Sequence, residues 1–344
     1  MTQTSSAHAG RPEEIPNPFE LPPVLGQSLR ALRPWHDREH EAYYLPVDRA
    51  EEGYRSFVNH LPDPSTHLTR FGQLVVVAGP TGCGRTSLIH RCVHHLKQEF
   101  DGASGGRIMA APVADLSRER AFDLEMVGRR GDFDQYLALL AYKIRSRLSR
   151  QLEGLSDPGD QPMQGKVAFT RLGRDLEDAD AVAIIVLPQF NDATWKRSML
   201  SLQAMHPINH YLDLVGERMI LFAESDNPQQ IKDWSDRVRG EAREGVLVIE
   251  VGMLTGTDGW TFANGRLQMC DHPRVPTVTA ETMHAVMEDH RSMSLKQLQK
   301  MCFHLWDEAR RRPGAKEVSK HDFDRYYVDR RDGYRPRGRG IKNG

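Results

Sequence analysis

A glycine-rich stretch holds the residues whose types and spacing are best suited to chemistry. Residues 79–87 read GPTGCGRTS and directly follow the apolar run LVVVA at 74–78. Glycines at this spacing let backbone N–H groups turn toward phosphate oxygens, and the start of a following helix adds its dipole. The pattern predicts a phosphate-binding loop; the alternative is a strand-to-helix turn that binds nothing. The residues expected to contact ATP or ADP are Gly79, Pro80, Thr81, Gly82, Cys83, Gly84, Arg85, Thr86 and Ser87, with the Thr86 hydroxyl as a magnesium ligand if nucleotide binds.

Arg85 departs from the phosphate-loop pattern G-x-x-x-x-G-K-[ST], which has lysine at this position. A lysine ammonium is a compact charge on a flexible stem, whereas a guanidinium is larger, planar and fixed in its fork geometry. The substitution therefore predicts weak nucleotide binding or none.

Five short apolar runs are typical of strands that are buried on both faces of a parallel sheet. Helical patterns separate these runs, and from Ala280 onward the pattern is wholly helical. The order predicts an α/β fold, with a five-stranded parallel P-loop sheet followed by a C-terminal helical lid. The runs are Leu74–Ala78, Arg107–Val113, Ala181–Leu187, Arg218–Ala223 and Gly245–Val251.

Composition divides the chain further. Both ends are poor in periodic apolar residues, the first rich in proline and the last in arginine and glycine. The expected divisions are a flexible Pro-rich arm and lead-in at 1–40, a P-loop α/β domain at 41–270, a helical lid at 271–329 and a basic tail at 330–344.

The loop, the strand order and the lid together resemble the AAA+ and STAND-type P-loop ATPase superfamily, in its initiator-like branch. LPVDRAEEGYRSFVNHL at 45–61 resembles the helix that covers the adenine base in these proteins. SLKQLQKM at 294–301 resembles their sensor-2 helix, with Lys296 in place of the usual arginine. The resemblance also implies a polar sensor-1 residue after the fourth strand, for which Ser225 and Asn227 are the candidates.

The same resemblance implies an Asp–Glu pair at the end of the third strand, to hold magnesium and to orient water. Here AVAIIVLPQF ends in Pro188 and Gln189 instead. Two carboxylates are candidates to replace the pair: Asp192, if the following loop curls back, and Glu224, after the fourth run. Loss of both acids removes most of what phosphoryl-transfer chemistry requires from a protein.

Three functions follow as hypotheses. The first is a degenerate pseudo-ATPase that senses nucleotide or serves as a structural subunit of a larger assembly. The second is a slow ATPase that uses Asp192 or Glu224. The third is a nucleic-acid adaptor that acts through the basic tail 330–344, since Arg-Gly segments follow phosphate backbones.

Composition sets the remaining expectations. The chain of 344 residues has a formal net charge of −1, only four cysteines, and no apolar run long enough to span a bilayer. It shows no signal-peptide pattern, so we expect a cytoplasmic protein with protein partners or self-association and no membrane contact. His90 and His94 have the i, i+4 spacing of a metal pair, but a solvated helix face is the preferred interpretation because no third ligand is evident.

Overall fold

The computed structural model describes residues 15–21, 30–102, 109–118, 133–155, 165–188, 207–240, 245–270 and 272–333. Its contacts divide the chain into two compact units. One unit runs from Ala31 to Met253, and the other begins at Leu254 and includes the N-terminal segment up to Arg30.

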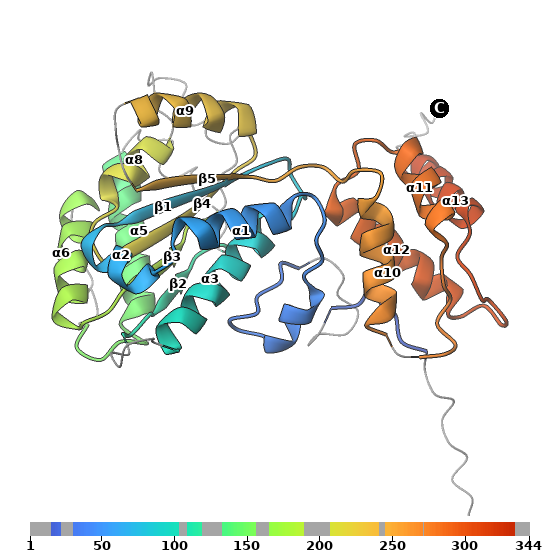
Figure 1. The fold of residues 1–344 in the computed structure, drawn as a ribbon, viewed down its shortest axis with the longest axis horizontal. Coiled ribbons are helices and arrows are strands. Elements are labelled where there is room, and N and C mark those ends of the chain that lie inside the picture. Colours follow the sequence, from blue (N-terminus) through green and yellow to red (C-terminus); the bar gives the residue numbers. More distant parts are fainter. Residues whose placement is uncertain are drawn as a thin grey trace, which may run out of the picture. The chain divides into compact units, whose positions relative to one another are not determined.

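The first unit is built on a five-stranded parallel sheet, which confirms the predicted α/β fold (Figure 1). The strand order is β2-β3-β4-β1-β5, so the first strand in sequence lies between the fourth and the fifth. The carboxyl ends of these three strands therefore meet at one edge of the sheet. The strands are β1 (Gln73–Ala78), β2 (Val113–Asp115), β3 (Ala183–Val186), β4 (Met219–Ser225) and β5 (Val246–Glu250).

The second strand lies later in the chain than predicted. The run Arg107–Val113 was expected to form it, but β2 begins where that run ends and pairs with β3 from Val113 to Asp115. Ala110 forms only an isolated bridge with Ala181. The apolar pattern missed the strand because its last residue is a buried aspartate.

The helices of this unit alternate with the strands, as the sequence pattern predicts. A short 3-10 helix, η1 (Arg38–Tyr43), precedes the α-helices. The α-helices of this unit are α1 (Ala50–His60), α2 (Pro64–Arg70), α3 (Arg85–Asp101), α5 (Phe133–Leu148), α6 (Gly165–Asp178), α8 (Pro207–Leu214) and α9 (Pro228–Gly240).

These helices cover both faces of the sheet, because successive residues of a strand point to opposite sides. In β1, Leu74 and Val76 pack in the core formed with α5, α6, α8 and α9. Val75 and Val77 pack in the other core, with α1, α2 and α3. Gly53 lets α1 approach β5 closely, since a Cβ atom there would lie 2.6 Å from Ile249 Cγ2. The result is a doubly wound sheet that is buried on both sides.

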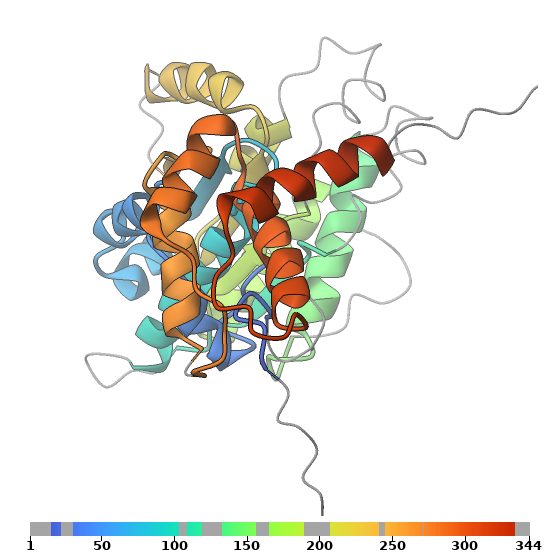
Figure 2. The same ribbon diagram turned by 90° about the vertical axis from the view of Figure 1, so that its right-hand side faces the viewer.

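The second unit is helical, as expected for the lid (Figure 2). Its helices are α10 (Asp258–Gln268), α11 (Ala280–Asp289), α12 (Leu295–Ala309) and α13 (Lys320–Gly333). The boundary after Met253 places α10 in this unit, whereas the expected divisions placed it in the P-loop domain. Helix α13 extends to Gly333, so residues 330–333 of the expected basic tail are helical, and residues 334–344 lie outside the described residues.

The same unit includes residues 15–21, which composition assigned to a flexible arm. They are packed rather than free in this stretch, because the Phe19 side chain is fully buried among aromatic residues. Within the described ranges, no helix is long and apolar enough to cross a membrane.

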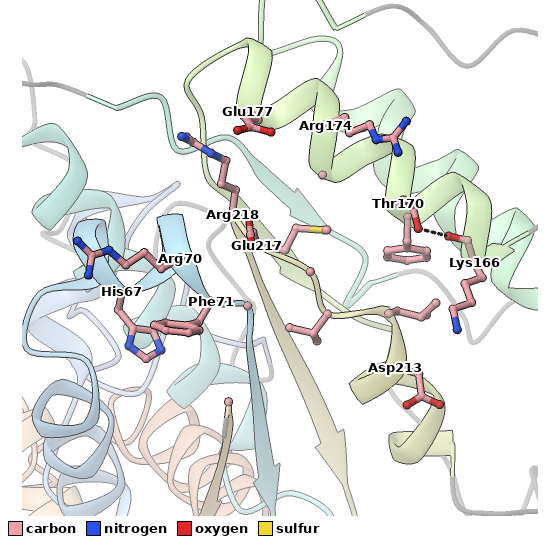
Figure 3. Close-up of a pocket in the computed structure, with 18 residues that line it drawn as sticks. His67, Arg70, Phe71, Lys166, Thr170, Arg174, Glu177, Asp213, Glu217 and Arg218 are labelled. Carbon is pink, nitrogen blue, oxygen red and sulfur yellow. Dashed lines mark hydrogen bonds between the residues drawn. The ribbon is translucent and has the colours of Figure 1, made fainter. Parts of the chain in front are cut away.

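A cavity of about 820 Å³ lies at the amino ends of the strands (Figure 3). Gly72, Met219 and Gly245, at or just before the starts of β1, β4 and β5, line it, and Arg70 and Lys166 stand at its sides. Ligands of open α/β sheets bind at the carboxyl ends of the strands. No residue of the glycine-rich loop lines this cavity, which lies at the opposite end of the sheet.

Candidate nucleotide-binding site

The glycine-rich loop connects the end of β1 to the start of α3, which is the predicted strand–loop–helix context. The Gly79 N–H donates to the Ser225 carbonyl at 3.0 Å, which anchors the start of the loop to the end of β4. A Cβ atom at Gly79 would lie 2.5 Å from the Val251 carbonyl oxygen, so only glycine fits between the strands. Gly82 and Gly84 have φ angles of 86° and 93°, which glycine adopts at little cost. The backbone path therefore has the form of a phosphate loop.

The Arg85 side chain folds back across this loop. Its Nη1 donates to the Gly79 carbonyl at 2.8 Å, and its Nε lies 3.5 Å from Glu224 Oε2. The side chains of Arg85 and Glu224 are only 11% and 3% exposed. The guanidinium is therefore held by groups of the protein itself.

Thr86, the expected magnesium ligand, is engaged by the same carboxylate. Its hydroxyl donates to Glu224 Oε1 at 2.6 Å. Glu224 is the penultimate residue of β4, and it lies beside Val77 at the carboxyl end of β1, just before the loop begins. One carboxylate therefore joins the arginine and the hydroxyl that sequence reasoning assigned to phosphate and to magnesium.

Three other candidate residues, Ser225, Asn227 and Cys83, are bonded within the protein or buried. Asn227 Oδ1 accepts from the Gln230 N–H at 3.1 Å, in the first turn of α9. Ser225 is buried, and its hydroxyl accepts from the Asn227 N–H at 3.2 Å. Burial raises the pKa of Cys83 to about 11, so the thiol stays protonated at neutral pH despite the nearby Arg85.

The residues expected near the reacting phosphates are only partly described. Pro188 follows the end of β3, in the place where the resemblance implies an acid. Gln189 and Asp192 lie outside the described residues. Lys296 is exposed in the first turn of α12, in the helical unit.

The lead-in before β1 packs on the first turns of α3. The Leu32 N–H donates to Ser87 Oγ at 3.2 Å, and the Tyr44 hydroxyl donates to the Ser87 carbonyl at 2.7 Å. Ser87, expected to contact nucleotide, thus bonds the lead-in on both its side chain and its backbone.

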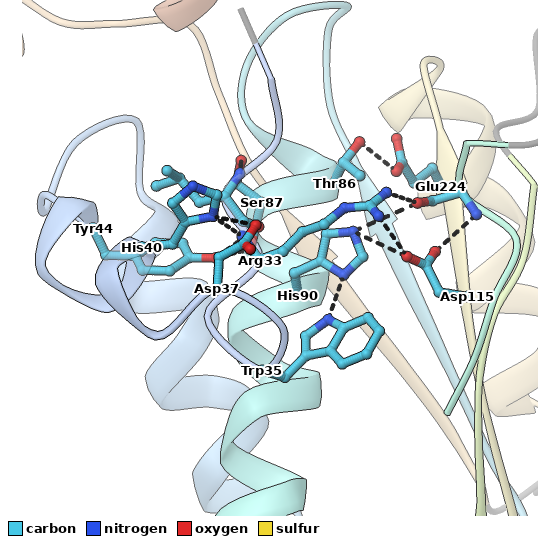
Figure 4. A network of polar contacts seen from close by, with 12 residues as sticks. Arg33, Trp35, Asp37, His40, Tyr44, Thr86, Ser87, His90, Asp115 and Glu224 are labelled. Atoms are coloured by element: carbon cyan, nitrogen blue, oxygen red, sulfur yellow. Dashed lines mark hydrogen bonds and ion pairs between the residues drawn. The ribbon is translucent and has the colours of Figure 1, made fainter. Parts of the chain in front are cut away.

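A buried polar network continues from this contact along α3 (Figure 4). Arg33 Nη1 lies 3.1 Å from Asp115 Oδ2, and Arg33 Nη2 donates to Ser117 Oγ at 3.0 Å. His90 lies beside them, with its Nε2 4.0 Å from Asp115 Oδ2, and its Nδ1 accepts from Trp35 Nε1 at 3.1 Å. The network fixes the lead-in to both α3 and the end of β2.

This geometry overturns the expected solvated face for His90, which is fully buried. Among the described residues, no group of three or more histidine, cysteine, aspartate or glutamate side chains is arranged to hold a metal ion. Burial lowers the pKa of His90 to about 4, although the Asp115 carboxylate acts to raise it. Burial acts to raise the pKa of Asp115, but interactions with His90, Arg33 and Ser117 lower it overall. His90 is therefore neutral and Asp115 ionised at neutral pH.

His90 should make the fold sensitive to acid. Because its folded pKa of about 4 lies below the usual 6.5, only the unfolded chain gains a proton between these values, and stability falls as pH falls through this range. A full shift of this size corresponds to roughly 3 kcal/mol. We expect His90→Gln to flatten the loss of unfolding free energy between pH 7 and pH 4.5, measured by urea denaturation. Equal slopes for His90→Gln and the parent would contradict this assignment.

Arg33 and Asp115 are parts of this network that the sequence did not predict. The printed sequence places them 82 positions apart, and neither belongs to a recognisable motif. The one local sign in the sequence was the position of Asp115, a charged residue at the end of the short apolar run APVAD at 111–115.

No protein-family model and no curated protein sequence matches the chain. Among solved structures, it is similar to the Aeropyrum pernix ORC1 protein in complex with DNA, with a TM-score of 0.52 and 13% identity over 82% of this chain and 65% of that one. It is also similar to the Aeropyrum pernix ORC2 protein in ADPNP-ADP complexes, with a TM-score of 0.50 and 12% identity over 82% of this chain and 66% of that one.

The chain thus spans slightly less than two thirds of the length of either protein. At such identities the similarity establishes the fold alone. Both proteins are AAA+ P-loop ATPases. The sheet order, the strand–loop–helix and the helical unit agree with this similarity: the chain has the fold of the AAA+ P-loop ATPases.

Proposed function

We propose that this chain is a degenerate AAA+-like P-loop protein, a nucleotide-sensing or structural subunit of a larger assembly that hydrolyses little nucleotide. The observation that supports this most directly is the position of Arg85, whose guanidinium bonds the Gly79 carbonyl and faces Glu224. A phosphate group entering the loop would have to displace these contacts.

The loop backbone fits a phosphate, but its side chains fit one poorly. Gly79, Gly82 and Gly84 give the backbone the path of a phosphate loop, and α3 begins directly after it. The two side chains that would hold phosphate and magnesium, Arg85 and Thr86, are instead bonded within the protein. Bound nucleotide would supply its phosphates to the loop N–H groups, and the chain would have to release Arg85 and Thr86 to hold it.

The end of β3 also argues for low turnover. Phosphoryl transfer relies on positioning and charge stabilisation, which require a metal-binding carboxylate and a group that orients water. Pro188 has no side-chain group for either role. The nucleotide-binding fold of this chain would therefore serve a structural or sensing role with little hydrolysis.

A second candidate function is a slow ATPase in which Glu224 serves as the magnesium carboxylate. The 2.6 Å hydrogen bond between Thr86 and Glu224 favours it, because it places a carboxylate beside the residue expected to bind the metal. Arg85 would first have to leave this carboxylate. The two candidate functions therefore differ in whether Arg85 moves away from Glu224 when nucleotide is present.

Turnover distinguishes the two candidates. We expect the parent chain, supplied with ATP and magnesium, to turn over far more slowly than the enzyme median of about 10 per second. Thr86→Ala and Glu224→Gln, purified in parallel, should not lower this background. A rate near the median that either substitution abolishes would overturn the first candidate and support the second.

We propose that the chain acts in an assembly, and that nucleic acid is a candidate ligand of the basic tail 330–344. The DNA complex of the ORC1 protein supports considering nucleic acid for this chain.

A further inference from the structure

Residues Ile15–Leu21 form an extended segment that is seated in the helical unit. Its centre is shielded from solvent: Asn17, Pro18 and Phe19 are all buried, and Phe19 is 0% exposed. The Phe19 ring centroid lies 4.7 Å from that of Trp306 and 5.9 Å from that of Phe262. The segment therefore places one aromatic side chain between two aromatic residues of the unit.

Three hydrogen bonds fix the backbone and the asparagine of this segment. All three involve groups of α12 or of the residue that ends it. Gln299 Nε2 donates to the Phe19 carbonyl at 2.5 Å, Asn17 Nδ2 donates to the Phe303 carbonyl at 2.8 Å, and Arg310 Nη1 donates to the Ile15 carbonyl at 2.9 Å.

Gln299 is the most informative of these partners, because its side chain is buried in α12. Its Nε2 finds its acceptor in the segment, and its Oε1 has no hydrogen-bond partner among the residues that the structure describes. A buried amide without partners costs stability. The position of Gln299 is thus explained by a main-chain carbonyl that lies against α12.

We infer that the residues around Phe19 in the helical unit, Phe262, Gln299 and Trp306, form a binding site for an extended peptide of the Asn-Pro-Phe type, occupied in this chain by its own residues Asn17–Phe19. Main-chain hydrogen bonds and one buried aromatic anchor are the usual basis of peptide recognition. Pro18 restricts its own φ and disfavours helix at Asn17, which lowers the entropy lost when the segment binds. The ligand class is an extended segment with an asparagine two residues before a phenylalanine.

The N-terminal segment is bonded within one unit, and the chain then continues into the other. Ile15–Leu21 is anchored in the helical unit, and the next described stretch is anchored in the P-loop unit through Leu32 and Arg33. The arm is therefore a second covalent connection between the units, in addition to the chain at Met253–Leu254.

A labelled synthetic peptide with the sequence IPNPFEL tests the site in the full-length chain. In the parent, the tethered segment competes at an effective concentration of order 1 mM, so the free peptide should bind poorly. Phe19→Ala removes the anchor of the tethered segment, and Asn17→Ala removes its amide contact. Both variants should bind the peptide at least about tenfold more tightly than the parent, as measured by fluorescence anisotropy.

Two controls sharpen the result. Pro16→Ala, at an exposed residue of the segment, should behave like the parent, and a peptide in which alanine replaces the phenylalanine should not bind. Asn17→Ala carries the test if Phe19→Ala does not fold. Equal peptide affinity in the parent and in folded variants, or no binding to either variant, would overturn the inference.

Discussion

Replacing Arg85 with alanine is expected to lower the free energy of unfolding by about 3 kcal/mol. Removing one partner of a buried ion pair costs roughly 3–5 kcal/mol, because the other charge stays buried. Arg85 is also the first residue of α3, where the helix dipole disfavours a cation by roughly 0.3–1 kcal/mol, and its removal relieves that cost. The pair dominates because Glu224 is only 3% exposed. Urea denaturation followed by circular dichroism measures the change.

The matched control is Arg55→Ala. Arg55 pairs with Glu51 one turn earlier in α1, and its side chain is 73% exposed. An exposed pair of this kind contributes at most about 0.5 kcal/mol. A loss for Arg85→Ala as small as that of Arg55→Ala would show that the buried contact has little energetic weight.

A double-mutant cycle separates the pair from its surroundings. In the Arg85→Ala background, adding Glu224→Gln removes the buried charge, so the double variant should recover part of the lost stability. Independent, additive losses for the two substitutions would contradict the proposed coupling.

The phosphate loop was predictable from the sequence. The contacts by which Glu224 engages Arg85 and Thr86 were not. The apolar run before Gly79 and the glycines after it specify a strand, a turn and a helix through local conformational preferences alone. The contact between Thr86 and Glu224 spans 138 positions of the chain, and only the order of strands in the sheet determines it. Glu224 was a candidate carboxylate on chemical grounds, but its two partners emerge from the pairing of β4 with β1.

Long-range burial explains the other differences. His90 begins the largely polar stretch HRCVHH at 90–95, which suggested an exposed helix face. Its contacts with Trp35 and Asp115 come from distant parts of the chain, so the local pattern could not predict its burial. Proline content suggested a flexible arm and lead-in at 1–40, because proline does not continue helices or strands. An isolated phenylalanine between Pro18 and Glu20 was the one local sign that this stretch packs.

Opening the loop is expected to restore nucleotide binding. In Arg85→Lys alone, the introduced amine still faces the Glu224 carboxylate, so the gain should be small. Adding Glu224→Gln removes that charge, which also repels phosphate, and leaves a compact cation on a flexible stem. The double variant should therefore bind ADP at least about tenfold more tightly than the parent, a gain of about 1.4 kcal/mol.

Calorimetric titration of ATP with magnesium into the parent chain and into Arg85→Lys/Glu224→Gln tests most directly whether the phosphate loop is closed by its own side chains. The account predicts a parent dissociation constant near or above about 1 mM, and a constant for the double variant at least about tenfold lower, with both proteins folded by circular dichroism. Micromolar binding by the parent that the double substitution weakens would contradict it, because Arg85 would then be a ligand of the phosphates rather than their substitute.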